Sequence, residues 1–159
     1  MSTPVSATNF RSALSVWPSG VTLVSTGDVT RFITVSAFSS VSLEPPLVLV
    51  SINNESLVLG TVVQSAVFAV NILAQGQQLI SNAGASRSRV SLESVPHVAG
   101  NNGCAIVVGA AATLECDVWS VHPAGDHTVV IGLVTHTTVA EQAPLLYHRG
   151  RYGSFSPDQ

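Results

Sequence analysis

From Gly20 onward the chain is a series of short runs rich in Val, Ile and Thr, separated by turn residues such as Gly27-Asp28. These residue types favour strands because their branched side chains pack well on a pleated sheet. Few of the connecting segments carry a helical pattern, so the sequence favours a closed barrel over a parallel sheet with crossover helices. The predicted strands cover residues 21–25, 32–37, 47–52, 67–73, 111–121, 128–138 and 145–148.

Three short helices are expected beside these strands. Apolar residues recur with helical spacing from Phe10 to Trp17, with Thr8 as the predicted N-cap and Pro18 as the end of the helix. The other two predicted helices cover residues 56–64, capped by Ser56, and 77–83. No repeat or linker divides residues 1–159, so we expect a single, mainly β domain.

The chain carries few charges. Only 9% of its 159 residues are charged, against about 25% in an average domain, and all six basic residues are Arg. The formal net charge is -3. This composition argues against a disordered chain and against a nucleic-acid binder with a basic surface. It also excludes any reaction that needs a lysine amine.

The shortage of charge indicates that part of the surface is covered, most simply by a second copy of the chain, so we expect a homodimer. A codon bias that replaces Lys by Arg explains the missing Lys but not the low total charge. The longest stretch without a polar side chain, residues 103–112, is about half of the ~20 residues that a membrane-spanning helix needs. The opening MSTPVSATNFR has no signal-peptide pattern, so we expect a cytoplasmic protein without membrane contact.

Two cysteines, Cys104 and Cys116, are too few for a disulfide framework and are expected to be buried free thiols. Paired Cys and His residues at the spacing of a metal site do not occur in the sequence, so we predict no metal site. The sequence also lacks a GxGxxG motif after a strand and a GxSxG motif. A dinucleotide held in Rossmann fashion and a serine hydrolase are therefore not expected.

Residues 31–43 alternate with a period of two. If they form one strand, one face is apolar and the other carries the hydroxyls of Thr34, Ser36, Ser40 and Ser42. An uncharged face with donors and acceptors suits a ribityl chain, a carbonyl-rich ring edge or a phosphate. An ordinary solvent-facing strand is the alternative.

Further polar clusters lie at predicted element ends. Ser56 begins a helix after Asn53, and a helix N-terminus binds phosphate readily, although plain N-capping explains Ser56 equally well. His127 follows a Pro-Ala-Gly-Asp turn, where it donates to a carboxamide, shuttles a proton or is simply satisfied by Asp126. Residues 147–153 combine Arg and Tyr, which suit a phosphate and a planar ring, or form a solvated hairpin.

Several of these segments occur in one order along the chain: FRSALSVWPSGVTLVST, TVSAFSSVSLEPPLVLVSI, SAVFAVNILA, LECDV, HPAGDHTVVIGLV and APLLYHRGRYG. In this order they resemble the short-chain flavin reductase family, flavin-binding split-barrel proteins that supply reduced flavin to two-component monooxygenases. The resemblance covers nearly the whole chain. It implies an FMN-binding split β-barrel with a Greek-key-like arrangement, a homodimer with flavin near the subunit interface, and a partner flavin-dependent monooxygenase.

The resemblance also implies the site. Hydride passes from NADH or NADPH to FMN or FAD, and the protein aligns the two rings, so no side chain acts as a covalent or acid–base catalyst and His127 is an orienting group. The implied contacts are Thr34, Val35, Ser36 and Ala37 along the flavin ring edge and ribityl chain; Ser39, Ser40, Ser51, Asn53, Ser56 and Leu57 around the phosphate; and His127, Arg151 and Tyr152 facing the nicotinamide nucleotide.

Two departures from the family pattern stand out. Phe32-Ile33 occupies the place of a Gly-Met or similar pair, and the segment GASRSRVSLESV has Arg87 and Arg89 but neither the Asp nor the Phe of the family's Asp-Arg-Phe segment. Either arginine is a candidate for the expected flavin contact. A flavin-binding protein without nicotinamide-dependent turnover, and a split barrel that binds haem or a deazaflavin, are the alternative functions.

Overall fold

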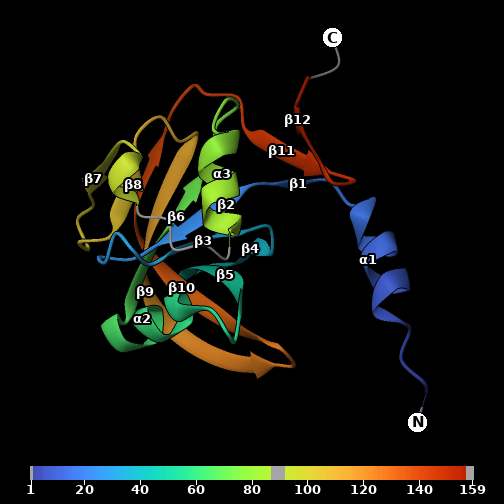
Figure 1. Cartoon of the computed structure of the whole chain (residues 1–159). Coiled ribbons are helices and arrows are strands. Elements are labelled where there is room, and N and C mark those ends of the chain that lie inside the picture. The colour runs from blue at the N-terminus through green and yellow to red at the C-terminus, as the bar shows by residue number, and fades with distance from the viewer. Residues whose placement is uncertain (1, 87–91, 157–159) are drawn as a thin grey trace.

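The computed structural model describes residues 2–86 and 92–156. Its main feature is a seven-stranded sheet in the order β3-β2-β6-β9-β10-β5-β4, in which every neighbouring pair is antiparallel. The sheet curls around a core (Figure 1). Its strands are β2 (Thr22–Ser25), β3 (Phe32–Val35), β4 (Phe38–Leu43), β5 (Pro46–Asn53), β6 (Val67–Ile72), β9 (Ala112–Ala124) and β10 (His127–Val139).

Smaller elements surround this sheet. A three-stranded sheet has the order β1-β11-β12, and β7 pairs with β8. The strands are β1 (Ser19–Gly20), β7 (His97–Ala99), β8 (Ala105–Val107), β11 (Leu145–His148) and β12 (Arg151–Ser154). The helices are α1 (Ala7–Ser15), α2 (Leu57–Ser65), α3 (Gln78–Ala85) and the short 3-10 helix η1 (Leu92–Ser94). In the described part of the chain, no helix has the length and apolar character needed to cross a membrane.

The predicted mainly β fold with short helices is confirmed, and each predicted strand and helix has a counterpart. Two details are wrong. The hydroxyl of Ser6, not Thr8, caps α1 by accepting a hydrogen bond from the Asn9 N–H. The barrel is split rather than closed, because β3 and β4 are the two edges of the seven-stranded sheet and do not pair.

The hydroxyl-lined face expected on residues 31–43 does not form, because the chain bends between β3 and β4. The Phe38 N–H donates to the Ser36 carbonyl (3.0 Å) at this bend. The two halves then pair on different partners, β3 with β2 and β4 with β5. Ser36 and Ser40 are exposed, whereas Thr34 is half-buried, so these hydroxyls do not share one face.

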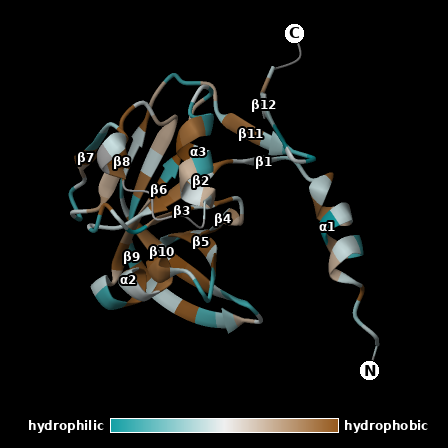
Figure 2. Cartoon of the chain, in the orientation of Figure 1, coloured by the Kyte–Doolittle hydropathy of each residue, from teal (hydrophilic) through white to brown (hydrophobic). Residues whose placement is uncertain are grey.

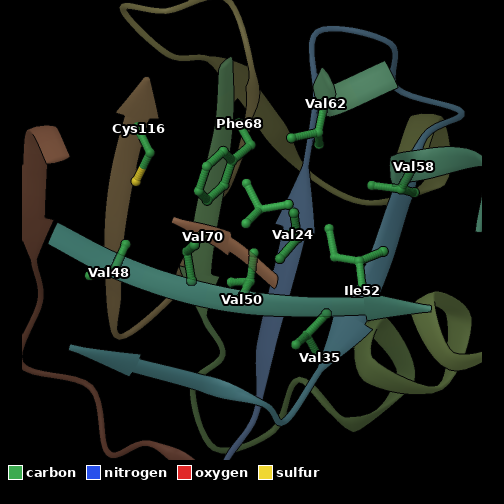
Figure 3. Packing of buried hydrophobic residues seen from close by; sticks show 11 residues of the cluster. Val24, Val35, Val48, Val50, Ile52, Val58, Val62, Phe68, Val70 and Cys116 are labelled. Atoms are coloured by element: carbon green, nitrogen blue, oxygen red, sulfur yellow. The ribbon is translucent and has the colours of Figure 1, made fainter. Parts of the chain in front are cut away.

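The barrel interior is filled by apolar side chains from all sides (Figure 3). Val48, Val50 and Ile52 alternate along β5 and point into it, and Phe68 faces them from β6. Val58 and Val62, on one face of α2, pack into the same cluster. Burial of a large apolar side chain contributes about 1.5–3 kcal/mol, so α2 is held against the barrel by its core-facing residues.

Strand β2 is buried on both faces: Val24 points into the barrel cluster, and Leu23 belongs to a second cluster with Leu73, Leu92 and Leu145. Apolar residues concentrate in this body, as the brown segments of Figure 2 show. By contrast, α1 extends away from the barrel and buries none of its residues (Figure 1). Its end is joined to the β11–β12 turn by a hydrogen bond from the Arg149 N–H to the Ser15 carbonyl.

Candidate functional site

A cavity of about 630 Å³ lies where β3, the start of α2 and the end of α3 meet. This volume falls within the range of about 300–1,000 Å³ that is typical of small-molecule and cofactor sites. The described residues that line the cavity combine apolar groups, hydroxyls and one charge of each sign. They are residues 30–34, 53, 55–58 and 83–86.

The first turn of α2 forms one wall of this cavity. The Ser56 hydroxyl accepts a hydrogen bond from the Val58 N–H (3.3 Å), and the Asn53 side-chain oxygen accepts from the Glu55 N–H (2.8 Å). These bonds fix the entry into the helix, whose N-terminus carries partial positive charge. The wall therefore suits an anionic group such as a phosphate.

The end of β5 is tied to the β9–β10 turn. Asn54 donates to the Gly125 carbonyl (3.1 Å) and accepts from the Thr128 hydroxyl (2.7 Å). Its own backbone N–H donates to the Asp126 carbonyl (3.0 Å). As a result His127, at the start of β10, is the Cα partner of the cavity residue Asn53.

The imidazole of His127 contacts its neighbour in the turn. Its Nδ1 lies 2.7 Å from Oδ1 of Asp126, and this hydrogen bond lowers the pKa of the Asp126 carboxyl. The contact leaves Nε2 of His127 without a hydrogen bond from the described residues, and the ring is partly exposed. The predicted turn that presents this histidine at the start of a strand is confirmed.

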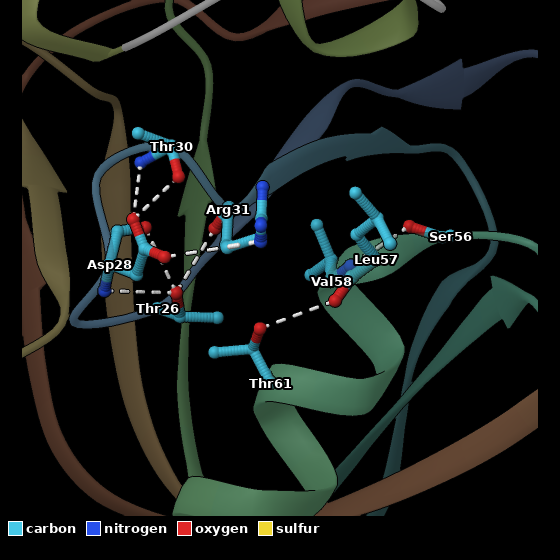
Figure 4. A network of polar contacts seen from close by, with 8 residues as sticks. All are labelled: Thr26, Asp28, Thr30, Arg31, Ser56, Leu57, Val58 and Thr61. Atoms are coloured by element: carbon cyan, nitrogen blue, oxygen red, sulfur yellow. Dashed lines mark hydrogen bonds and ion pairs between the residues drawn. The ribbon is translucent and has the colours of Figure 1, made fainter. Parts of the chain in front are cut away.

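The opposite wall begins at the turn between β2 and β3 (Figure 4). The Thr26 hydroxyl donates to the carbonyls of Asp28 and Arg31, both at 3.1 Å, and accepts from the Asp28 N–H. Thr30 donates to the Asp28 carboxylate through its hydroxyl (2.7 Å) and its N–H (2.9 Å), which lowers the pKa of Asp28. This network fixes the start of β3, where Arg31 lines the cavity.

Helix α3 closes the cavity from the side of β3. The Thr34 hydroxyl donates to the Ser81 carbonyl (2.7 Å), so only its lone pairs are left to accept from a ligand. A side chain at Gly84 would collide with the Thr34 hydroxyl and with Leu23. Gly84 therefore permits the close packing of α3 on β3 that shapes this wall.

The predicted site residues are distributed unequally. Thr34, Asn53, Ser56 and Leu57 line the cavity together, although they come from three separate segments. Val35 is buried in the barrel core, and its carbonyl accepts a hydrogen bond from the Thr22 hydroxyl. Arg87 and Arg89 lie outside the described residues. The other predicted flavin contacts lie along the bend, β4 and β5 without lining the cavity: Ser36, Ala37, Ser39, Ser40 and Ser51.

Arg151 and Tyr152 line a second cavity, of about 780 Å³, between the end of α1 and the β11–β12 hairpin. The Tyr152 hydroxyl reaches α3, where it contacts Ser81 (2.9 Å) and Asn82 (2.7 Å). The hairpin turns at Arg149 and Gly150, both of which have positive φ. The predicted C-terminal hairpin is thus present, and its side chains belong to a different hollow from Thr34 and Ser56.

Sequence reasoning missed the cavity residues 30, 31, 55, 58 and 83–86. The only signal for the first pair is the Gly27-Asp28 turn, which predicts that the next residues begin a strand. The Phe32-Ile33 pair, which replaces a Gly-Met or similar pair of the family pattern, also lines the cavity. This departure from the family pattern therefore falls in the candidate site.

The two cysteines are buried free thiols, as predicted. Burial raises the pKa of Cys104 to about 11 and that of Cys116 to about 12. Thiols with such values are protonated near neutral pH and are poor nucleophiles.

The model of the family described as "Flavin reductase like domain" matches residues 14–156. The chain belongs to this family. A reductase subunit of a flavin-dependent monooxygenase from Rhodococcus jostii, HsaB, is 34% identical over 94% of this chain and 78% of its own length. The NADH-dependent FMN reductase AsuE2 from Streptomyces nodosus subsp. asukaensis is 36% identical over 91% of this chain and 83% of its own.

Solved structures of flavin reductases share the fold. The NADH:FAD oxidoreductase SgcE6 from Streptomyces globisporus superposes with a TM-score of 0.91 at 31% identity, covering 99% of this chain and 98% of its own. The flavin reductase PheA2 superposes with a TM-score of 0.87 at 35% identity, covering 96% of this chain and all of its own. The predicted family and split-barrel fold are therefore confirmed for this flavin reductase.

Proposed function

We propose that this chain transfers a hydride from NADH or NADPH to FMN or FAD and supplies the reduced flavin to a partner monooxygenase. The observation that carries the proposal is the cavity between β3, α2 and α3, whose described lining combines an apolar wall, hydroxyls, a helix N-terminus and Arg31. The relatives support the same activity, because they are named as NADH-dependent FMN or FAD reductases and as reductase components of monooxygenases.

The cavity residues fit a phosphorylated flavin. Ile33 and Leu57 offer an apolar surface for a planar ring, and Thr34 offers an acceptor. The Ser56 hydroxyl lies at the N-terminus of α2, where the helix dipole would stabilise a phosphate. When bound, the flavin would supply the chemistry, since its ring accepts the hydride and the reduced flavin then serves the partner monooxygenase. The protein's own task is to bind the ring and exclude other orientations.

On the donor side, His127 is the orienting group in this proposal. Its ring is partly exposed beside Asn53, and its contact with Asp126 holds the imidazole in one orientation. Arg151 and Tyr152 would meet the nucleotide part of the donor from the β11–β12 hairpin, where an arginine and an aromatic ring suit a phosphate and a base.

Steady-state oxidation of NADH and NADPH, with FMN and FAD supplied separately, tests the activity. We expect nicotinamide consumption well above the rate with free flavin alone. Tight flavin binding without turnover would instead identify a flavin-binding protein that is not a reductase. An absorbance spectrum of the purified protein separates flavin from haem or a deazaflavin.

We also infer a homodimer, as the low charge of the chain suggests. Support comes from α1, which has nine residues and buries none of them against its own chain, while Phe10, Leu14 and Trp17 are exposed. An isolated helix shorter than ~12 residues is marginal in water, so α1 needs a surface to pack on. A cytoplasmic location stays a prediction from the sequence.

A further inference from the structure

Arg31 holds a special position in the flavin cavity. Among the described residues that line it, Arg31 is the only one with a positive charge and Glu55 the only one with a negative charge. The two arise from different walls, Arg31 at the start of β3 and Glu55 beside the first turn of α2. Among the described lining residues, Arg31 therefore offsets the negative charge of Glu55.

The backbone of Arg31 is fixed before any ligand binds. Its N–H donates to the Asp28 carbonyl (2.8 Å), and its own carbonyl accepts from the Thr26 hydroxyl (3.1 Å). Binding therefore needs little ordering of the main chain at this point, which favours affinity.

The guanidinium group of Arg31 is only loosely engaged. Its Nε lies 3.9 Å from the Asp28 carboxylate, and the side chain is 32% exposed. Asp28 is already bound by Thr30 through two hydrogen bonds. The terminal Nη groups of Arg31 have no other hydrogen-bond or ion-pair partner among the described residues. Figure 4 shows the side chain extending toward Ser56, Leu57 and Val58 at the start of α2.

We propose that Arg31 binds the phosphate of the flavin and makes the cavity selective for phosphorylated flavins over riboflavin. This inference rests on the proposed function, because it assigns a contact within the flavin site. A planar guanidinium with unengaged N–H donors matches a phosphate, and a charge-assisted hydrogen bond is about twice as strong as a neutral one. The N-terminus of α2 adds a favourable field on the other side of the same group.

The test compares two flavins that share the ring and ribityl chain and differ in the phosphate. FMN and riboflavin are titrated into the wild-type chain, Arg31→Gln and Arg31→Lys, and dissociation constants are read from flavin fluorescence. We expect Arg31→Gln to weaken FMN binding about tenfold or more, with riboflavin binding unchanged. Arg31→Lys should recover part of the loss, because it keeps the charge but not the planar fork. Added salt should weaken FMN binding more in the wild type than in Arg31→Gln.

Arg11→Gln is the matched control, since it removes the same charge from exposed α1 outside the cavity. It should leave both dissociation constants unchanged. An equal loss of FMN and riboflavin affinity in Arg31→Gln would show a structural role for Arg31 and overturn the inference, as would unchanged FMN binding. Failure of the wild type to bind either flavin would overturn the proposed function itself, which is a different outcome from an effect confined to Arg31.

Discussion

His127 on β10 lies opposite Asn53 on β5 in an antiparallel ladder, so a turn histidine is held beside a residue that lines the cavity between β3, α2 and α3. The pairing does not depend on the imidazole, because the ladder continues through Thr128 and Ile52. The side-chain bonds of Asn54 to Gly125 and Thr128 reinforce it. The position of His127 is therefore set by sheet register, and its side chain is free to be changed without moving the backbone.

Replacing His127 by Ala should raise the KM for the nicotinamide donor while leaving flavin binding intact. Loss of one hydrogen bond of about 0.5–1.5 kcal/mol predicts an increase of roughly two- to tenfold. Steady-state rates with varied NADH at saturating FMN give the KM. The control is His136→Ala, which changes an exposed histidine farther along β10. It should change neither the KM for NADH nor the affinity for flavin. An unchanged KM in His127→Ala would remove this residue from the donor site.

Ser56→Ala tests the wall formed by α2. Ser56 caps the helix, and removing such a cap costs about 1 kcal/mol; if the hydroxyl also meets the phosphate, FMN should bind about fivefold more weakly. Ser6→Ala is the matched control, because Ser6 caps α1 in the same way and lies outside the cavity. FMN titration gives the dissociation constant of both variants. Equal FMN affinities in Ser56→Ala and Ser6→Ala would show that the Ser56 hydroxyl does not contact the phosphate.

The fold was largely predictable because its strands carry their own signal. Runs of branched apolar residues mark β5, β6 and β10 closely, since such side chains pack well on a pleated sheet. The break between β3 and β4 was not predictable, because the bend at Ser36-Ala37 contains neither Gly nor Pro. The alternating pattern continues across the bend and imitates a single strand.

The site was predictable only in part, because some of its residues carry a local sequence signal and others do not. Ser56 stands out in the sequence because a helix cap is a local feature. Arg31 and Gly84 do not stand out, because their importance comes from packing between segments that are far apart in the chain. Gly84 matters only because Thr34 lies against it, and Arg31 only because the start of α2 lies across the cavity. The family resemblance supplied the order of the motifs but gave no information at these two positions.

Asn71 should be a major determinant of stability. This fully buried side chain on β6 donates to the Leu23 carbonyl (3.2 Å) and the Ser25 hydroxyl (3.0 Å), and accepts from the Val107 N–H (2.8 Å). Asn71→Ala leaves buried groups without partners, each at a cost of about 1–3 kcal/mol, so we expect a loss of about 3 kcal/mol in the free energy of unfolding. Urea denaturation measures it, with exposed Asn9→Ala as the control. A loss below ~1 kcal/mol would show that the hydrogen bonds of Asn71 are not a major determinant of stability.

The buried thiols predict how stability changes at alkaline pH. Their pKa values rise from 9.0 to about 11 for Cys104 and about 12 for Cys116, so the unfolded chain loses these protons first. Their contribution is therefore complete below pH 9 and is lost as the pH rises through 9 toward 11–12. The Tm of the wild type should fall over this range, and less steeply in a Cys104→Ala, Cys116→Ala variant. Identical slopes would show that other groups control the alkaline transition.

The apolar face of α1 should hold the proposed homodimer together. Phe10 and Leu14 lie one turn apart on one side of α1, and Trp17, just after its C-cap, is 75% exposed in the single chain. Burial of a Phe or Leu contributes about 1.5–3 kcal/mol, so Phe10→Ala with Leu14→Ala should raise the dimer dissociation constant by at least about 100-fold. Light scattering across a dilution series should give twice the chain mass of 16.5 kDa for the wild type and a lower mass for the variant. Thr8→Ala, on the opposite face of α1, should stay dimeric. A wild type that is monomeric, or a Thr8→Ala variant that dissociates equally, would show that this face of α1 is not the interface.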